Sequence, residues 1–111
     1  MKSMFNTKNW SGQNRLALTA TQIVAGLAKL DSWRLHGEAA QVAIEKTFVF
    51  DNFDETMSFI NGVAFIAKRQ DHHPEILLTY NRCVVRFNTH DVGGISSTDI
   101  ECAAQVDALL A

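Results

Sequence analysis

The sequence predicts an α+β fold in which helices cover one face of an antiparallel sheet. In three segments apolar residues recur every three or four positions, and in others they recur at every second position. The first spacing is typical of helices and the second of half-buried strands. The segments follow the order helix, two strands, helix, strand region, helix, which is a layout of the α+β class.

The first part of the chain predicts a helix and then a pair of strands. The helix is expected to run to about residue 30, and the residues that indicate it are the apolar Ile23, Leu27 and Leu30 and the capping candidates Thr19 and Thr21. Residues 33–36 and 43–50 then alternate between apolar and polar side chains. With a turn at Gly37 between them, these two segments predict a hairpin-like pair of strands.

The clearest helix covers residues 54–69, with Asn52 or Asp54 as its N-cap. Its expected apolar stripe consists of Met57, Ile60, Ala64 and Ala67, and it is flanked by Phe53, Val63 and Ile66. Residues 76–88 follow as a strand region, because apolar and polar side chains alternate along most of it. A turn around Tyr80-Asn81-Arg82, or a partner strand, is needed to fold this region back on itself.

The final helix is expected to open at Ser96-Ser97-Thr98-Asp99. Ser96 followed three residues later by Asp99 resembles a capping box, with aspartate in place of the usual glutamate. Its apolar side is then formed by a run of residues at helical spacing, which are Ile100, Ala103, Ala104 and Val106.

Composition suits one ordinary globular domain and excludes several classes of function. The chain has 111 residues, of which 47% are hydrophobic and 20% charged. A formal charge of −2 gives no electrostatic basis for direct binding to nucleic acid or an anionic membrane. No apolar run reaches the roughly 20 residues of a membrane helix, and the start lacks the apolar core of a secretory signal. We expect a cytoplasmic protein with a flexible extension at residues 1–18 and one domain at residues 19–111.

Three of the four histidines lie in two clusters that flank the predicted strand region. Asp71-His72-His73-Pro74 lies where a helix passes into that region, and Thr89-His90-Asp91 lies where it ends. Histidine exchanges protons near neutral pH, and a carboxylate nearby can orient an imidazole, so together the clusters suit acid–base catalysis. Adjacent residues in extended backbone point to opposite faces, so we expect His72 and His73 to face different walls. Our hypothesis is that the two clusters meet in one site.

The same residues also allow other interpretations. Each histidine alone fits a surface or capping position, and both Asp71 and Asp99 fit structural roles as caps. A zinc site is a further alternative, although adjacent histidines are poor co-ligands and HExxH is absent. A nucleophilic cysteine is disfavoured because Cys83 lies with apolar residues on its strand. We expect Cys83 and Cys102 to be buried thiols in a reducing compartment.

Taken together, the separated motifs resemble the pterin-4a-carbinolamine dehydratase family. The family pattern joins a charged residue to a His-His-Pro motif, an aromatic residue, a later histidine and a closing aspartate. The matching residues in this chain are Lys68, His72-His73-Pro74, Tyr80, His90 and Asp99. The resemblance covers roughly residues 19–111, and the spacing fits throughout.

The resemblance implies a two-layer sandwich, in which three helices cover one face of a four-stranded antiparallel sheet. A fourth strand would come from splitting residues 76–88 or the region before them. The implied activity is that of a lyase that dehydrates 4a-hydroxytetrahydrobiopterin to quinonoid dihydropterin, which recycles the cofactor of aromatic amino-acid hydroxylases. No metal or organic cofactor is implied. Open sheet edges and the resemblance both favour a homodimer or homotetramer.

A different class of function on the same fold is a protein-binding regulator. Some animal members of the family act as dimerisation cofactors for a homeodomain transcription factor. An enzyme that acts on a pterin is our main interpretation, and the regulator is the alternative.

By resemblance, the pterin-binding residues are Asp71, His72, His73, Pro74, Asn88, Thr89, His90 and Asp91. The predicted catalytic residues are His72, His73, His90 and Asp99. Loss of the 4a-hydroxyl needs one proton delivered to the oxygen and another removed from a ring nitrogen, so His72 and His90 are the expected acid–base pair. His73 is expected to hold the pterin, and Asp99 or Asp91 to orient or balance an imidazole. Which histidine is the acid stays open.

Overall fold

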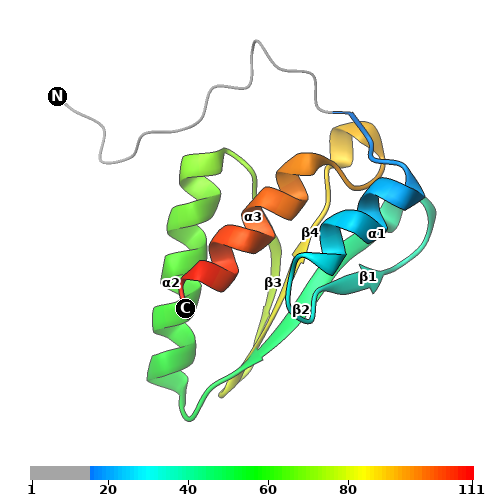
Figure 1. Ribbon diagram of the computed structural model, residues 1–111. Helices are drawn as coiled ribbons and strands as arrows, with labels where there is room; N and C mark the ends of the chain where they lie inside the picture. The colour runs from blue at the N-terminus through cyan, green and yellow to red at the C-terminus, as the bar shows by residue number, and fades with distance from the viewer. Residues whose placement is uncertain (1–15) are drawn as a thin grey trace, which may run out of the picture.

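The computed structural model describes residues 16–111 and confirms the predicted α+β fold (Figure 1). Within these residues the helices are α1 (Ala20–Ala28), α2 (Phe53–Gln70) and α3 (Ser97–Ala108), with short 3-10 helices η1 (Ala39–Gln41) and η2 (His90–Val92). The strands are β1 (Arg34–His36), β2 (Ala43–Val49), β3 (Glu75–Leu78) and β4 (Arg82–Phe87). They form one antiparallel sheet in the order β1-β2-β4-β3, and the three longer helices lie on one side of it.

The fourth strand arises because the region predicted over residues 76–88 is a hairpin. β3 and β4 pair in antiparallel register from Glu75 opposite Arg86 to Leu78 opposite Cys83. Thr79 donates its amide to the carbonyl of Arg82 at 2.9 Å and closes the turn. The predicted turn at residues 80–82 is therefore confirmed, and it returns the chain to the end of the sheet from which it came.

Alternation along the central strands decides which face of the sheet is buried. In β4, Cys83, Val85 and Phe87 are fully buried, whereas the residues between them are exposed or half-buried. Ile44 and Phe48 of β2 join them in the core beneath the helices. The other face of the sheet is left without a covering layer in the described chain.

Helix α2 has the predicted position, but its predicted buried stripe is wrong in phase. Asn52 caps it by accepting the amide of Glu55 at 2.9 Å. The buried residues are Thr56, Phe59, Val63, Ile66 and Ala67. Of the predicted stripe only Ala67 is among them, together with two of the flanking residues, Val63 and Ile66. Helical spacing fits both sets, because α2 carries apolar side chains on adjoining faces. Contacts with the sheet decide which of these two faces is buried. One such contact joins Phe59 to Phe48 of β2, with ring centroids 4.5 Å apart.

The described chain begins just before α1, and its first residues already pair with the domain. Ala17 forms an antiparallel bridge with Ser96, and the Leu18 amide donates to the Ile95 carbonyl at 2.7 Å. Thr19 then caps α1 by accepting the amide of Gln22. The predicted extension falls mostly on residues 1–15, which lie outside the described residues. Within residues 16–111, none of the helices has the length and apolar character needed to cross a bilayer.

Candidate active site

The first histidine cluster is positioned by the way α2 ends. Asp71 adopts a left-handed conformation with φ of 49°, which aspartate tolerates better than most residues. The Asp71 amide donates to the Lys68 carbonyl at 3.3 Å, and the His72 amide donates to the Ala67 carbonyl at 3.1 Å. These two bonds form a Schellman motif. Beyond it, His72 is buried and His73 is exposed, as expected for adjacent residues that point to opposite faces.

His72 and Asp99 form a buried pair. His72 Nε2 lies 2.6 Å from Asp99 Oδ1, and the two side chains are 7% and 0% exposed. An ionised carboxylate can only accept, so Nε2 donates in this bond and Nδ1 of the neutral imidazole is an acceptor. The imidazole also stacks on Phe87, with ring centroids 6.0 Å apart and planes 13° apart. The ring is therefore held in one orientation from two sides.

Asp99 is fixed in turn by the start of α3. Its Oδ2 accepts the amide of Ser96 and the hydroxyl of Thr89, each at 2.8 Å. The hydroxyls of Thr89 and Ser96 lie 2.5 Å apart, and all three residues are almost fully buried. The sequence allowed Asp99 either a capping role or a place beside a histidine, and the structure shows one carboxylate making both sets of contacts.

The second cluster lies on a tight loop after β4, at the top of Figure 1. The Thr89 amide donates to the Gly94 carbonyl at 2.8 Å, which closes the loop at its base. Gly93 has a φ of 64°, a conformation that glycine adopts without strain. As a result Thr89 is buried under the loop, while His90 and Asp91 are exposed on it.

A pocket of about 270 Å³, which we call the histidine hollow, joins the two clusters. Its lining is Asp71, His72, His73, Asn88, Thr89, His90 and Asp91. Of the predicted pterin-binding residues only Pro74 is outside the lining; it is half-buried just before β3. Asp99 is also outside it and contacts His72 instead. The clusters meet because the β3–β4 hairpin brings the end of β4 back to the end of α2.

Sequence analysis gave Ser96 only a capping role, and it missed a group of residues beside the histidine hollow. A second pocket of about 260 Å³, which we call the side hollow, shares His73 and Asn88 with the first. Its other lining residues are His36, Gly37, Gln41, Ala43, Glu75 and Arg86. These come from four separate segments, and only the pairing register of the strands brings them together. The sequence indicated the strands but not their order in the sheet.

Neither alternative chemistry gains support from the described residues. Within residues 16–111 no group of three or more His, Cys, Asp or Glu side chains is placed to hold one metal ion. Cys83 and Cys102 are both buried, as expected. Burial raises the pKa of the Cys83 thiol to about 11, which disfavours the thiolate that a nucleophile needs.

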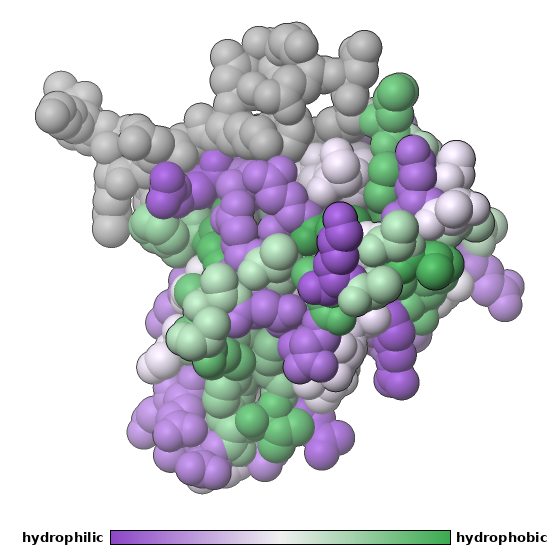
Figure 2. Space-filling view, viewed as in Figure 1, coloured by the Kyte–Doolittle hydropathy of each residue, from purple (hydrophilic) through white to green (hydrophobic). Residues whose placement is uncertain are grey.

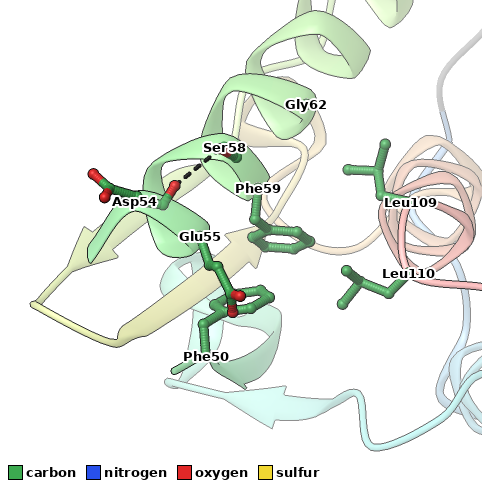
Figure 3. Close-up of a pocket in the computed structure, with 8 residues that line it drawn as sticks. All are labelled: Phe50, Asp54, Glu55, Ser58, Phe59, Gly62, Leu109 and Leu110. Carbon is green, nitrogen blue, oxygen red and sulfur yellow. Dashed lines mark hydrogen bonds between the residues drawn. The ribbon is translucent and has the colours of Figure 1, made fainter. Parts of the chain in front are cut away.

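A larger pocket of about 500 Å³, which we call the apolar hollow, lies between the first half of α2 and the end of α3. Figure 3 shows the rings of Phe50 and Phe59 on one side of it and Leu109 and Leu110 on the other. In Figure 2 this region shows apolar surface bordered by hydrophilic residues. It has no histidine in its lining. Its polar residues are Asp54, Glu55 and Ser58, whose hydroxyl donates to its own helix. It therefore lacks the imidazoles that exchange protons near neutral pH in the histidine hollow.

The fold and the site together define an α+β protein with a buried histidine–aspartate pair at a polar hollow. The model of the family described as Pterin 4 alpha carbinolamine dehydratase matches residues 16–109. The chain therefore belongs to the pterin-4a-carbinolamine dehydratase family, as the motif resemblance indicated.

Relatives that carry the family name match most of the chain. A protein of Paracidovorax citrulli (strain AAC00-1) is 61% identical over 109 residues, which cover 98% of this chain and 94% of that protein. A protein of Bdellovibrio bacteriovorus is 48% identical over 97 residues, which cover 84% of this chain and 78% of that protein.

Solved structures show the same fold. A crystal structure from Brucella melitensis, described as a transcriptional coactivator/pterin dehydratase, superimposes with a TM-score of 0.80 at 32% identity and covers 86% of this chain and 99% of its own. A pterin dehydratase-like protein, identified as a RuBisCO assembly factor in the alpha-carboxysome, gives a TM-score of 0.60 at 25% identity. The match covers 71% of this chain and 89% of that protein. Members and relatives of this family thus carry descriptions from more than one class of function.

Proposed function

We propose that the protein is a lyase that dehydrates 4a-hydroxytetrahydropterins, with 4a-hydroxytetrahydrobiopterin as the type substrate. The observation that carries this proposal is the buried His72–Asp99 pair at the wall of a hollow that His90 also lines. In the reaction the bond between C4a and the hydroxyl oxygen breaks and water leaves. The adjacent ring nitrogen loses its proton, and a carbon–nitrogen double bond forms to give the quinonoid dihydropterin.

His72 suits the removal of a proton from the ring nitrogen. Because Nε2 donates to Asp99, Nδ1 is the nitrogen that can accept. The carboxylate stabilises the imidazolium that forms and keeps the ring in one tautomer. Asp99 does not line the hollow, so it acts as a positioning residue through His72.

His90 suits the delivery of a proton to the leaving hydroxyl. It lines the same hollow but is exposed on its loop, so it can exchange protons with solvent between turnovers. His73 and Asn88 supply further hydrogen-bonding groups at the wall and would hold the pterin ring. We infer that the reaction needs no metal or organic cofactor, because every group it requires is present in these side chains.

The experiment that tests this function is turnover of chemically prepared 4a-hydroxytetrahydropterin by the purified protein. Formation of the quinonoid product should be faster with protein than in buffer, in proportion to protein concentration. The control is the double variant His72→Ala/His90→Ala, whose rate should fall to the buffer rate. Absence of acceleration by folded wild-type protein would rule out the proposal. We further infer that the product re-enters the cofactor pool of aromatic amino-acid hydroxylases after reduction.

A protein-binding regulator is the alternative function. The observation that favours it is the similarity to structures described as a transcriptional coactivator and as a RuBisCO assembly factor. The uncovered face of the sheet offers a surface for such a partner, with Val49 and Leu77 60% and 55% exposed on it. A histidine hollow that binds pterin without turning it over would favour this function.

We also propose that the protein assembles as a homodimer or homotetramer, with a complete histidine hollow in each subunit. The edge strands β1 and β3 and the uncovered face leave hydrogen-bonding groups and apolar side chains open to a second copy. Light scattering at micromolar concentration measures the mass directly. A value near 12.3 kDa, the mass of one chain, would contradict assembly.

A further inference from the structure

Thr89 lines the histidine hollow, but its hydroxyl is bonded inside the protein. The residue is 1% exposed, and by resemblance to the family it is a pterin-binding residue. Its hydroxyl oxygen lies 2.8 Å from Asp99 Oδ2 and 2.5 Å from the hydroxyl of Ser96. Both contacts are buried, so this hydroxyl serves the His72–Asp99 pair and is not available to a ligand in the hollow.

The direction of these hydrogen bonds follows from the number of protons. An ionised carboxylate only accepts, so the single hydroxyl proton of Thr89 is donated to Asp99. In the contact between the two hydroxyls, Ser96 is then the donor and Thr89 the acceptor. A chain of donors therefore runs from Ser96 through Thr89 to Asp99, and hydrogen bonds in such a chain strengthen one another.

Two donors share one oxygen of Asp99. Oδ2 accepts the Thr89 hydroxyl and the Ser96 amide, each at 2.8 Å, which leaves Oδ1 to His72 Nε2 at 2.6 Å. The carboxylate is fully buried, and a buried anion needs hydrogen-bond donors to stay ionised. Of the two donors at Oδ2, the Ser96 amide belongs to the backbone. The Thr89 hydroxyl is therefore the one that a side-chain substitution can remove.

Ionisation of Asp99 decides which nitrogen of the imidazole carries the proton. An ionised Asp99 accepts from Nε2 of His72 and leaves Nδ1 free to accept, as the proposed reaction requires. A protonated Asp99 would instead donate to Nε2, and the neutral ring would then carry its proton on Nδ1. Loss of the Thr89 hydroxyl therefore favours the tautomer in which Nδ1 cannot act as a base.

The backbone of Thr89 anchors the loop that carries the other histidine. Its amide donates to the Gly94 carbonyl at 2.8 Å, and its carbonyl accepts the amide of Val92 at 3.1 Å. His90 follows directly after Thr89 at the start of η2. One residue thus supports the expected base through its side chain and the expected acid through its backbone.

We propose that Thr89 is a positioning residue, whose hydroxyl keeps Asp99 ionised and His72 in its Nε2–H tautomer, and not a pterin-binding residue. The inference rests on the proposed function for the role of His72 as the base. Thr89 touches neither the substrate nor the reacting atoms and acts only through Asp99 and His72. Its hydroxyl is therefore needed for the rate of the reaction and not for binding of the pterin.

Nuclear magnetic resonance of ¹⁵N-labelled protein without substrate measures the tautomer directly, and the His72→Ala variant identifies the His72 signals. Wild-type protein should carry the ring proton on Nε2. Thr89→Val removes the hydroxyl and keeps the shape of the side chain, and in this variant the Nδ1–H form should gain population. Thr89→Ser restores a hydroxyl and should return the wild-type pattern. An unchanged tautomer in folded Thr89→Val would overturn the inference.

Thr98→Val is the matched control. Thr98 is also 1% exposed, and its hydroxyl has no hydrogen-bond partner among the described residues. Its removal costs no hydrogen bond, so the His72 signals should stay as in wild-type protein. If Thr89→Val does not fold, Ser96→Ala replaces it. That variant removes the donor to Thr89, keeps the backbone amide at Oδ2, and should shift the tautomer in the same direction by a smaller amount.

Kinetics separates positioning from contact with the substrate. Thr89→Val should lower kcat about tenfold and leave KM within about twofold, the scale of one hydrogen bond to a charged group. In a His72→Ala background the same substitution should change kcat by less than about twofold, because the residue through which it acts is absent. A raised KM, or the full tenfold loss in that background, would show that Thr89 contacts the pterin and would overturn the inference. A wild-type protein without turnover whose tautomer still follows the hydroxyl would reject the proposed function alone.

Discussion

The histidine hollow and the apolar hollow lie at opposite ends of α2, and they differ in chemistry more than in size. The apolar hollow is the larger, about 500 Å³ against 270 Å³, and is lined mainly by aromatic and leucine side chains around the first half of the helix. The histidine hollow begins where the helix ends at Asp71. Volume alone would favour the apolar hollow as a site. Proton transfer near neutral pH is best served by imidazoles held in a fixed orientation, and the histidines are in the smaller hollow.

Local rigidity distinguishes the two ends further. At the histidine hollow, the Schellman motif, the His72–Asp99 pair and the closed loop at Thr89 each fix part of the wall by hydrogen bonds. At the apolar hollow, Leu109 and Leu110 follow the last residue of α3 and are 43% and 55% exposed. The comparison predicts that changes at the histidine hollow affect the rate, whereas changes at the apolar hollow affect only stability.

The largest effect is expected from the histidines themselves. His72→Ala and His90→Ala should each slow dehydration by about 100-fold or more, because each removes a positioned proton donor or acceptor. Steady-state kinetics on a synthetic 4a-hydroxytetrahydropterin measures the effect, and circular dichroism checks that each variant keeps its fold. Near wild-type turnover in both variants would show that the histidine hollow is not the site of proton transfer.

Asp99→Asn should have the next largest effect. The asparagine oxygen can still accept from Ser96 and Thr89, which places its NH₂ group opposite His72 Nε2. His72 then has to accept at Nε2 and carry its proton on Nδ1, the wrong nitrogen for a base in the hollow. We expect kcat to fall about tenfold or more with little change in KM, because Asp99 acts through His72.

The stability of the same variant separates positioning from simple capping. Unfolding in urea should show a loss of about 1–2 kcal/mol, since one charged hydrogen bond is replaced by a neutral one. If the rate stays at the wild-type value while stability falls, Asp99 is only a helix cap.

Much of this arrangement was predictable from sequence, because it depends on local patterns. The Ser96 and Asp99 spacing predicted the helix start, and a turn near Asn81 was one of the two ways in which the strand region could fold back. The split into two strands was implied by the family resemblance. The meeting of His72 with His90 followed once the strand region turned back. These features depend on spacing within a short stretch of chain, which the sequence displays directly.

The features that sequence could not predict depend on contacts between distant segments. The phase of the buried stripe on α2 is selected by partners such as Phe48, which lies on another element. The side hollow needs the order of the strands, since its residues Ala43, Arg86 and Glu75 come from β2, β4 and β3, which are neighbours in that order. Asp99 both caps α3 and contacts His72, and predicting both roles required knowing where His72 lies in three dimensions.

A smaller effect is expected at the apolar hollow. Leu109→Ala removes a half-exposed side chain that lies against Gly62, where an added Cβ would be 3.0 Å from Leu109 Cδ1. The variant should lose about 1 kcal/mol of unfolding free energy and keep wild-type turnover. Thermal melts and kinetics on the same preparation measure both. A clear loss of rate at full folding would show that the apolar hollow, too, contributes to function.

The smallest expected effect is that of metal removal, for which we predict no change in rate. Within residues 16–111 no group of three or more His, Cys, Asp or Glu side chains is placed to hold one metal ion. His73 is exposed, and adjacent histidines are poor co-ligands for one metal ion. Prolonged treatment with a chelator, followed by elemental analysis and a turnover assay, measures the dependence. Activity that disappears on chelation and returns only with added zinc would contradict a mechanism based on side-chain acid–base chemistry alone.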